Sequence, residues 1–474
     1  MNKKIRNILI IIFGILFFLG CPLAIFYSQG YRFDFRNKKF IKTGGLFLKT
    51  VPRQTDVYLD GKFKKKTDIL FGEAFLNNLI PKKYEITIKK EGYFSWEKNL
   101  EVKSGTVTEA KEITLFPKNL GFSSLTSDVQ DFTFSPDRKY MILKKMNKEK
   151  WELNVFNLDN NTQRKLLTET DLEQKIVSND TRDNKLKLLK IIWSHDSKKI
   201  LLKTEIEKKT KYFIKEIAQP EKEISTLPLL DNAKEASFNP NNTQELFFIK
   251  SIKDKDELFW INYQKNPSKN LPKLFTADVV TYKINNNKIY WLTTKGLLYG
   301  SDSLKNTPEV LNTVPLSFKN NSTYIIDIIK REILLRENNI LYKLNSNSGN
   351  FEKINIFANQ LKTSPDSKKL AAVNDHEIQI IFLEDIPSQP QRKRQEKVFL
   401  ARFSKKINNI FWLNDNYLLF NTGDKIKISE VDNRDSINII SIEKFENPEI
   451  FFNESNKKLY ILSSGTLYVS RALF

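Results

Sequence analysis

Residues 191–204 read IIWSHDSKKILLKT, and this stretch decides the fold because near copies of it recur along the chain. The pattern returns as FTFSPDRKYMILKK at residues 132–145 and as LKTSPDSKKLAAVN at residues 361–374. Each copy has an apolar segment, a short polar segment and a second apolar segment. Serine and proline favour the first two positions of a tight turn. Each copy therefore predicts two strands joined by a turn.

The pattern occurs eight times, with a mean step of about 45 residues. The turn markers are Ser135, Ser194, Asn239, Lys283, Asp327, Ser364, Leu413 and Asn453. A period of this length, built from paired strands, is typical of β-propeller blades, which bury both faces only when the ring closes. We therefore predict an all-β fold in which residues 118–474 form a β-propeller. Eight blades are favoured, and seven blades are the alternative because the middle copies are weak.

The two ends of the propeller segment suggest how the ring closes. The 21 residues after Asn453 hold two strand-like segments, KLYILSS and TLYVSRALF. A four-stranded blade that begins with the last copy therefore lacks an outer strand. Residues 119–127, NLGFSSLTS, precede the first copy and can supply that strand.

The strong copies resemble the TolB-like (WD-type) propeller repeat, whose core reads Phe/Trp-Ser-Pro-Asp-Gly followed by a basic residue. Arg138, Ser197 and Ser367 stand in place of the glycine, and His195 occupies the position that proline holds in other copies. We therefore interpret the histidine as a turn residue and not as part of a catalytic site. The resemblance covers residues 119–474, and it implies recognition of proteins or polysaccharides more often than catalysis.

The N-terminus predicts a membrane anchor. Residues 8–27 are apolar, and no charged residue occurs between Arg6 and Arg32. A run of about 20 apolar residues matches the hydrocarbon core of a bilayer and exceeds the apolar region of a cleaved signal peptide. Because basic residues precede the run, we predict a cytoplasmic tail over residues 1–7, a transmembrane signal anchor over residues 8–27 and an extracytoplasmic remainder.

Cys21 leaves a second kind of anchor open. The sequence FFLGC resembles a lipobox that ends in Gly20 and Cys21, and cleavage there would make the mature chain a lipoprotein. Phe18 stands where the lipobox has leucine, and the apolar run continues past the cysteine, so the signal anchor is favoured. Both alternatives tether the chain to a membrane.

Residues 44–117 predict a small antiparallel β-sandwich that follows a linker at residues 28–43. VYLDGK alternates apolar and polar residues before the tight-turn pair Asp60-Gly61, and YEITIKKEGYFSW at residues 84–96 alternates in the same way. These segments resemble the PEGA domain, although PRQT replaces its Pro-Glu-Gly-Ala signature. The resemblance implies an extracytoplasmic β module whose ligand is poorly defined.

Composition argues against several kinds of site. The single cysteine excludes internal disulfides and cysteine-based zinc sites, and two histidines make a histidine-rich metal site unexpected. The net charge of +21 comes from scattered lysines, so it does not by itself predict nucleic-acid binding. We predict no metal, no cofactor and no nucleic-acid partner.

Two segments interrupt the repeat. Residues 166–188 lengthen the first step, and we expect them to form an exposed loop. Residues 384–397 carry a basic run at residues 392–394, and we expect a solvated loop between strands. The alternative for the second segment is a contact with an acidic partner.

The sequence contains no recognisable catalytic motif. G-x-S-x-G, G-x-G-x-x-G, the P-loop and H-E-x-x-H do not occur in it. His376 lies between Asp375 and Glu377, and we expect it to be a surface loop residue. We therefore predict no catalytic, cofactor-binding or metal-binding residues.

The predicted function is that of a binding or scaffold protein anchored in the cell envelope. Its propeller would recognise a protein or a cell-wall glycan. The alternative is an extracytoplasmic enzyme that acts on glycans, which would need a pair of carboxylates in the propeller channel.

Overall fold

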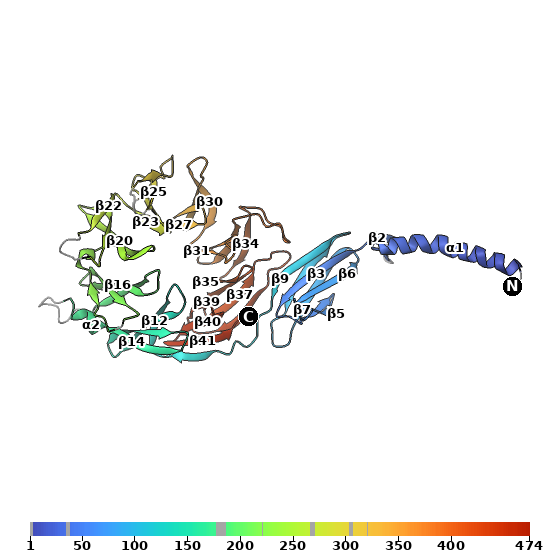
Figure 1. Ribbon diagram of the computed structural model, residues 1–474, viewed down its shortest axis with the longest axis horizontal. Helices are drawn as coiled ribbons and strands as arrows, with labels where there is room; N and C mark the ends of the chain where they lie inside the picture. The colour runs from blue at the N-terminus through green and yellow to red at the C-terminus, as the bar shows by residue number, and fades with distance from the viewer. Residues whose placement is uncertain are drawn as a thin grey trace.

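The computed structural model describes residues 3–34, 38–176, 186–219, 221–265, 271–302, 307–319 and 321–474. Figure 1 shows three parts in a row, namely one long helix, a small β-sandwich and a ring of β-sheets. Strands make up most of the described structure, which confirms the all-β fold class. The C-terminus lies next to the sandwich (Figure 1).

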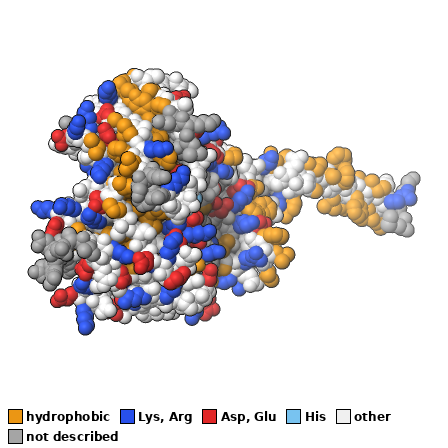
Figure 2. All heavy atoms as spheres, turned by 60° about the vertical axis from the view of Figure 1, so that its left-hand side comes forward, with side chains coloured by type: hydrophobic (Ala, Val, Ile, Leu, Met, Phe, Trp, Pro, Cys, Tyr) orange, Lys and Arg blue, Asp and Glu red, His pale blue; other side chains and the backbone are white. Residues whose placement is uncertain are grey.

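Helix α1 (Lys3–Ser28) projects away from the rest of the fold. The most apolar 18-residue window within Ile5–Ser28 has a mean hydropathy of 2.9, and no other part of the described chain buries this window. Figure 2 shows apolar side chains covering the helix, whereas charged side chains of both signs are scattered over the propeller. The helix is therefore long and apolar enough to cross a membrane.

The expected linker is partly structured. β1 (Tyr31–Asp34) and β2 (Lys39–Lys42) pair as an antiparallel hairpin within it. Residues 35–37 of the linker and residues 1–2 of the expected tail lie outside the described residues.

The sandwich packs a three-stranded sheet against a four-stranded sheet. Ile86 and Ile88 are fully buried, as their alternation predicts, and they share a core with Leu48, Val57 and Trp96. The first sheet has the order β6 (Glu73–Leu79), β3 (Gly44–Val51), β9 (Val107–Thr114), and the second has the order β5 (Lys62–Lys66), β4 (Asp56–Leu59), β7 (Lys82–Lys89), β8 (Trp96–Val102).

The expectation of a wholly antiparallel sandwich is wrong for one pair of strands. β3 and β9 pair in parallel, with Leu46 opposite Thr108. Parallel neighbours need a long connection between them. The chain provides one because five strands separate β3 from β9 in the sequence.

Beyond Pro117, the described residues form eight four-stranded antiparallel sheets arranged in a ring (Figure 1). First strands of neighbouring sheets contact one another, for example β23 with β27 and β35 with β39, so these strands line the centre. The propeller fold is therefore confirmed.

Seven of these sheets use four consecutive strands, and we number them along the chain. Sheets one to four are β11 (Val129–Phe134), β12 (Tyr140–Asn147), β13 (Lys150–Asn157), β14 (Thr162–Thr168); β15 (Lys187–Trp193), β16 (Lys199–Ile206), β17 (Lys209–Glu216), β18 (Ser225–Thr226); β19 (Glu235–Asn239), β20 (Asn242–Ile252), β21 (Lys255–Asn262), β22 (Lys273–Ala277); and β23 (Thr281–Asn285), β24 (Lys288–Leu292), β25 (Leu298–Asp302), β26 (Glu309–Val310). Sheets five to seven are β27 (Tyr324–Ile329), β28 (Glu332–Glu337), β29 (Ile340–Leu344), β30 (Phe351–Phe357); β31 (Gln360–Thr363), β32 (Lys369–Val373), β33 (Glu377–Phe382), β34 (Lys397–Arg402); and β35 (Ile407–Asn414), β36 (Tyr417–Thr422), β37 (Lys425–Glu430), β38 (Ile439–Lys444). A short 3-10 helix, η1 (Pro228–Leu230), follows β18.

Sheet eight closes the ring with strands from both ends of the propeller segment. β39 (Glu449–Asn453), β40 (Lys458–Ser463) and β41 (Thr466–Ala472) come from the C-terminus. β10 (Ser123–Thr126) supplies the outer strand and pairs with β41, with Ser123 opposite Val469. The predicted contribution of residues 119–127 is therefore confirmed.

Ser194 stabilises the turn after β15 through its side chain. Its hydroxyl donates to Asp196 Oδ1 at 2.6 Å and accepts from the backbone N–H of Lys199 at 2.9 Å. Ser197 holds the glycine position with a φ of 61°. The corresponding serines of sheets one and six make the same two bonds, so the motif is structural.

The turn markers predicted for two weak copies are misplaced. Lys283 and Asp327 lie inside β23 and β27, and shorter turns follow these strands. Asn286 and Lys330 have positive φ values of 52° and 54° in those turns. Two-residue turns of this kind close without a serine side chain, which explains why the motif is weak there.

The first inserted segment is more ordered than expected. It contains the end of β14 and helix α2 (Glu169–Glu173), which Thr168 and Asp171 start with a capping box. Glu169 is buried and accepts the backbone N–H of Trp151 at 3.0 Å. The expectation of an exposed loop is therefore wrong for this part, and residues 177–185 lie outside the described residues.

Candidate functional site

The first strands of sheets two, three and four border a cavity of about 520 Å³ at the centre of the ring. We call it the channel cavity. Its lining includes apolar and aromatic Ile192, Trp193, Tyr212, Phe238, Tyr282 and Ile284, and charged Lys190, Lys203, Lys234, Glu235 and Lys283. Successive side chains of a strand point to opposite faces, so Glu235 is exposed at the channel while Ala236 is buried in the core.

Cationic groups outnumber anionic groups at the channel cavity. Burial lowers the pKa of Lys203. The negative charge of Glu235 raises this pKa, and the positive charge of Lys190 lowers it. Among the described residues, neither Lys190 nor Lys283 forms an ion pair or a side-chain hydrogen bond. Their charges are therefore available to a ligand.

Lys234 differs from these lysines because it is neutralised within the fold. Its ammonium lies 2.6 Å from Asp256 Oδ2. Its backbone carbonyl accepts a bond of 2.6 Å from Lys203 Nζ, which fixes that ammonium at the cavity wall.

Trp193 lines the same cavity with part of its side chain, whereas its indole Nε1 is buried within the fold. Its indole Nε1 has no hydrogen-bond partner among the described residues. Trp412 occupies the equivalent position in sheet seven, where its Nε1 donates to the carbonyl of Lys362 at 2.8 Å. Buried polar groups are normally paired, and the indole N–H of Trp193 is one of four buried side-chain atoms without a partner among the described residues.

Two tyrosines, Tyr212 and Tyr282, lie in the wall of the cavity. Tyr282 bonds to Ser237 Oγ at 2.8 Å and donates to a backbone carbonyl at 3.0 Å. Tyr212 donates to the carbonyl of Ala233 at 3.2 Å. Burial raises the pKa of both hydroxyls. Both hydroxyls are therefore bonded inside the fold, and both rings pack against core clusters, with Tyr212 only 1% exposed.

A second cavity at the channel, of about 640 Å³, brings two carboxylates together. Asp131 of β11 and Glu449 of β39 both line it, with Lys144. Burial raises the pKa of each carboxyl, and the charge of Asp131 raises the pKa of Glu449 further. Sequence reasoning missed this pair because the two strands lie at opposite ends of the propeller segment and meet only when the ring closes.

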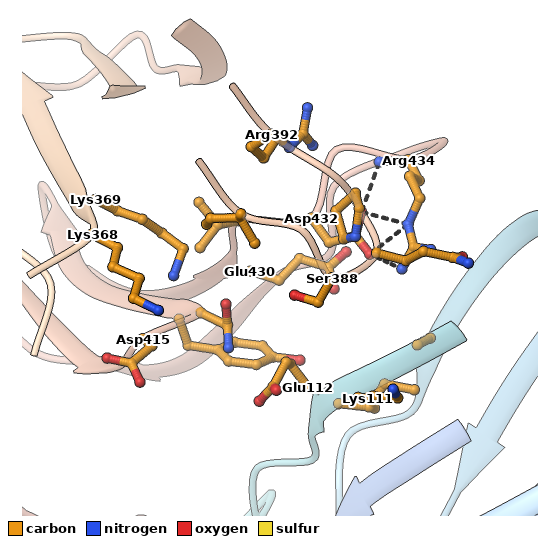
Figure 3. Close-up of a pocket in the computed structure, with 18 of the residues that line it drawn as sticks. Lys111, Glu112, Lys368, Lys369, Ser388, Arg392, Asp415, Glu430, Asp432 and Arg434 are labelled. Carbon is orange, nitrogen blue, oxygen red and sulfur yellow. Dashed lines mark hydrogen bonds and ion pairs between the residues drawn. The ribbon is translucent and has the colours of Figure 1, made fainter. Parts of the chain in front are cut away.

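A third cavity, of about 260 Å³, lies between the sandwich and the propeller (Figure 3). Its charges are largely paired with one another. Figure 3 shows Asp432 bonded to Arg434, and their ion pair measures 2.7 Å. Lys369 pairs with Asp366 at 3.3 Å, and Arg392, in the second inserted segment, pairs with Glu396 at 2.6 Å.

Beside this cavity a network of buried bonds joins the two domains. Lys98 of β8 lies 2.6 Å from Glu430 Oε1, and both side chains are almost fully buried. Trp96 Nε1 donates to Glu430 Oε2 at 2.8 Å. At the exposed edge of this network, Asp435 accepts the backbone N–H of Asn99 at 3.1 Å. We therefore interpret the third cavity as part of a joint and not as a ligand site.

Both histidines are exposed and lie between strands. His195 is exposed and lines the channel cavity, and the hydroxyl of Ser194 donates to Asp196 and not to the imidazole. His376 is exposed, and its Nδ1 lies 3.2 Å from the carbonyl of Phe403, which lies between β34 and β35. The described residues contain no group of three or more histidine, cysteine or acidic side chains that could hold a metal ion.

Comparison with known proteins identifies one domain of the chain. Residues 43–115 match the PEGA domain family. No curated protein matches the chain. Among solved structures, the chain is similar to the Cps50 (Swd1) β-propeller domain of Myceliophteria thermophila, with 11% identity over 73% of this chain and 96% of that chain and a TM-score of 0.39. It is also similar to the Dos1 propeller, with 11% identity over 74% of this chain and 93% of that chain and a TM-score of 0.45. At these TM-scores the fold assignment rests on the strand pairing described above.

Proposed function

We propose that the chain is a membrane-tethered binding protein of the cell envelope, in which α1 anchors a propeller that recognises a protein or a cell-wall glycan outside the cytoplasm. The apolar helix, the PEGA domain match and the cavities at the propeller channel support this proposal. The TolB-like relationship of the repeat and the absence of catalysis belong to the same proposal.

The observation that carries the proposal is the buried joint between the sandwich and the propeller. Besides the pair of Lys98 and Glu430, Arg434 donates to the carbonyl of Glu109 at 2.7 Å, and the hydroxyl of Tyr417 accepts the N–H of Thr114 at 3.0 Å. Buried and fully satisfied polar networks hold their parts in one arrangement. A propeller held in this way has a fixed position relative to the stalk, which suits the display of a binding surface.

A glycan-active enzyme is the second candidate, and Asp131 and Glu449 are the observation that favours it. Glycosidases use two carboxyl groups, one of which stays protonated until it donates to the leaving group. Burial raises the pKa of both side chains, as such an acid requires.

Membrane attachment is tested with the full chain in lipid vesicles. The protein should stay with the vesicles through an alkaline carbonate wash. A variant with Ile12→Lys and Leu16→Lys should move to the soluble fraction, because lysine at the centre of a span is strongly unfavourable. Wild-type protein in the soluble fraction would contradict the proposed anchor.

Recognition by the propeller is tested in cells with a photo-crosslinking residue in the full chain. One variant carries it at Gln130, which lines the channel, and a control carries it at Lys353 on the outer strand β30. A reproducible adduct from the channel position alone supports the proposal. Adducts of equal yield from both positions, or none from either, would contradict it.

A further inference from the structure

The hairpin formed by β1 and β2 belongs to neither sheet of the sandwich, and we call it the juxtamembrane hairpin. Among the described residues its two strands pair only with each other, with Tyr31 opposite Lys42 and Asp34 opposite Lys39. A two-stranded hairpin is at best marginally stable in water unless another surface covers it. The hairpin therefore depends on what lies against its faces.

Aromatic side chains join the juxtamembrane hairpin to the last turn of α1. The ring of Phe26 lies edge-on to that of Tyr31, with centroids 5.4 Å apart, and stacks on that of Phe40 at 6.0 Å. Phe33 and Phe40 meet across the hairpin at 5.3 Å. Phe40 is remote from the base of the hairpin and still touches the helix, so the hairpin folds back beside the end of α1, where Figure 1 shows β2.

Arg32 holds this arrangement in place. Its guanidinium lies 3.5 Å from the centre of the Tyr27 ring and donates to the backbone carbonyls of Tyr27 and Tyr31 at 2.9 and 2.8 Å. It also donates to Asn78 Oδ1 of β6 at 2.9 Å. One side chain thereby links the end of α1, the hairpin and the sandwich, and it keeps the hairpin level with the last turn of the helix.

Two rings of the juxtamembrane hairpin remain exposed despite these contacts. Phe33 and Phe40 are 39% and 50% exposed, and Tyr27 at the end of the helix is also exposed. Tyrosine rings are enriched at the interface of a bilayer, and phenylalanine rings accompanied by lysines insert into it. Because the candidate span ends at Ser28, the exposed rings continue its apolar surface to the level of the lipid headgroups.

The charges of the juxtamembrane hairpin are complementary to anionic lipid. The carboxylate of Asp34 is buried, whereas three lysines are exposed, namely Lys38, Lys39 and Lys42. Among the described residues these lysines form no ion pair and no side-chain hydrogen bond. Basic side chains next to a membrane span attract anionic headgroups. A bilayer surface would cover the rings and neutralise the lysines at the same time.

We propose that the juxtamembrane hairpin is a binding surface for anionic lipid headgroups, with its two exposed rings at the bilayer interface and its three lysines on the headgroups. This inference rests on the proposed function, since it requires α1 in a membrane, and it adds a lipid class to the anchor. The contact lies on one side of the span. It would therefore also set how the stalk leans on the membrane, because interfacial aromatic and basic residues set the tilt of a span.

The experiment is photo-crosslinking of the full chain in nanodiscs that contain phosphatidylcholine and phosphatidylglycerol in equal amounts. A diazirine analogue of phenylalanine replaces Phe40, and a second variant carries it at Phe33. Mass spectrometry identifies the lipid adducts. We expect adducts with both lipids at both positions, and more with phosphatidylglycerol by about fivefold, as expected for at least one lysine held at an anionic surface.

Phe71 is the matched control because it is 63% exposed at the opposite end of the sandwich. The hairpin adjoins the start of β3, whereas the carbonyl of Gly72 accepts the N–H of Thr50 near the end of that strand at 2.9 Å. A strand of eight residues spans roughly 27 Å, so the analogue at Phe71 lies beyond the headgroups and should give about tenfold fewer lipid adducts than the hairpin positions.

Lysine variants test the preference for anionic lipid. A chain with Lys38→Gln, Lys39→Gln and Lys42→Gln should still form lipid adducts but should lose the excess of phosphatidylglycerol. The control changes three exposed lysines of the propeller to glutamine and should keep that excess; they are Lys139, Lys198 and Lys255. Added salt should reduce the excess in wild type, because exposed charges are screened. Circular dichroism of each variant checks that the fold is intact.

The inference is overturned if neither hairpin position forms lipid adducts, if Phe71 forms as many, or if the excess of phosphatidylglycerol is absent or survives the hairpin substitutions. The anchor is tested separately by retention on vesicles. A chain that is retained but does not crosslink to lipid through the hairpin would refute the inference alone. Wild-type protein that is released from vesicles would refute the anchor.

Discussion

Lys98 Nζ lies 2.6 Å from Glu430 Oε1, and the two side chains are 0% and 4% exposed at the joint between sandwich and propeller. Removing one charge of a buried pair leaves the other uncompensated. We expect Lys98→Met to lower the free energy of unfolding by about 3 kcal/mol. Urea denaturation followed by tryptophan fluorescence measures the change.

A second variant distinguishes the loss of charge pairing from loss of packing. Glu430→Gln in the Lys98→Met background removes the stranded charge and keeps an oxygen that can accept from Trp96 Nε1, so part of the stability should return. The surface pair of Lys150 and Glu173 is the control, and Lys150→Gln should cost less than about 1 kcal/mol. Equal costs at both pairs would contradict the assigned role of the joint.

Asp435 makes the joint sensitive to acid. The backbone N–H of Asn99, its side-chain amide and Lys83 lower the pKa of this carboxyl well below its ordinary value. A lowered folded-state pKa contributes stability above the unfolded pKa of about 3.9, and that contribution is lost as the pH falls from there toward the folded-state value. We expect Asp435→Asn to reduce stability at pH 7 and to flatten its decline below about pH 4. Unfolding measured at pH 7, 4 and 3 for both proteins provides the test, and parallel curves would contradict it.

The repeat could be predicted from the sequence because every sheet of the propeller needs the same kind of turn. Each blade needs a turn between its first two strands, and the serine motif provides it locally, within about five residues. The closing strand β10 could be predicted because the segments at the C-terminus leave the last blade without its outer strand. The weak copies were misplaced because two-residue turns replace the motif there.

The joint and the cavities could not be predicted in this way. Lys98 and Glu430 are separated by more than 300 residues, and no periodic pattern connects them. The unpaired state of Trp193 depends on how the strand of the neighbouring sheet approaches it, since the same residue type at Trp412 finds a partner. Such features depend on tertiary packing, whereas periodicity reports only on single strands.

Ser194 and its neighbour His195 should differ sharply in their tolerance to substitution. Ser194→Ala removes the bonds to Asp196 and to the backbone of Lys199 in a fully buried position, and should destabilise the protein by about 1–3 kcal/mol. His195→Pro should leave stability unchanged, because proline stands at this position in other copies. Thermal unfolding of the two variants provides the comparison. A loss of stability in His195→Pro as large as that in Ser194→Ala would contradict the interpretation of the histidine as a replaceable turn residue.

Trp193 and Trp412 form a matched pair for stability as well. Replacing Trp412 with phenylalanine leaves the carbonyl of Lys362 without its donor and should cost about 1 kcal/mol or more. Trp193→Phe removes a donor that has no partner, so the ligand-free protein should be at least as stable as wild type. Calorimetric unfolding without ligand measures both changes. A larger loss at Trp193 would show that its N–H is satisfied in the free protein.

Asp131 and Glu449 decide between a binding protein and an enzyme. Because Asp131→Asn and Glu449→Gln remove both ionisable groups and keep the shape of the side chains, they would abolish hydrolysis by a carboxylate pair. For a binding protein we expect no release of reducing ends from cell-wall glycans by wild type or by the double variant. The raised pKa of each carboxyl shows that its ionised form is unfavourable in the fold. Because the same substitutions remove both negative charges, the free energy of unfolding at pH 7 should rise. Turnover by wild type that disappears in the double variant would establish the enzyme instead.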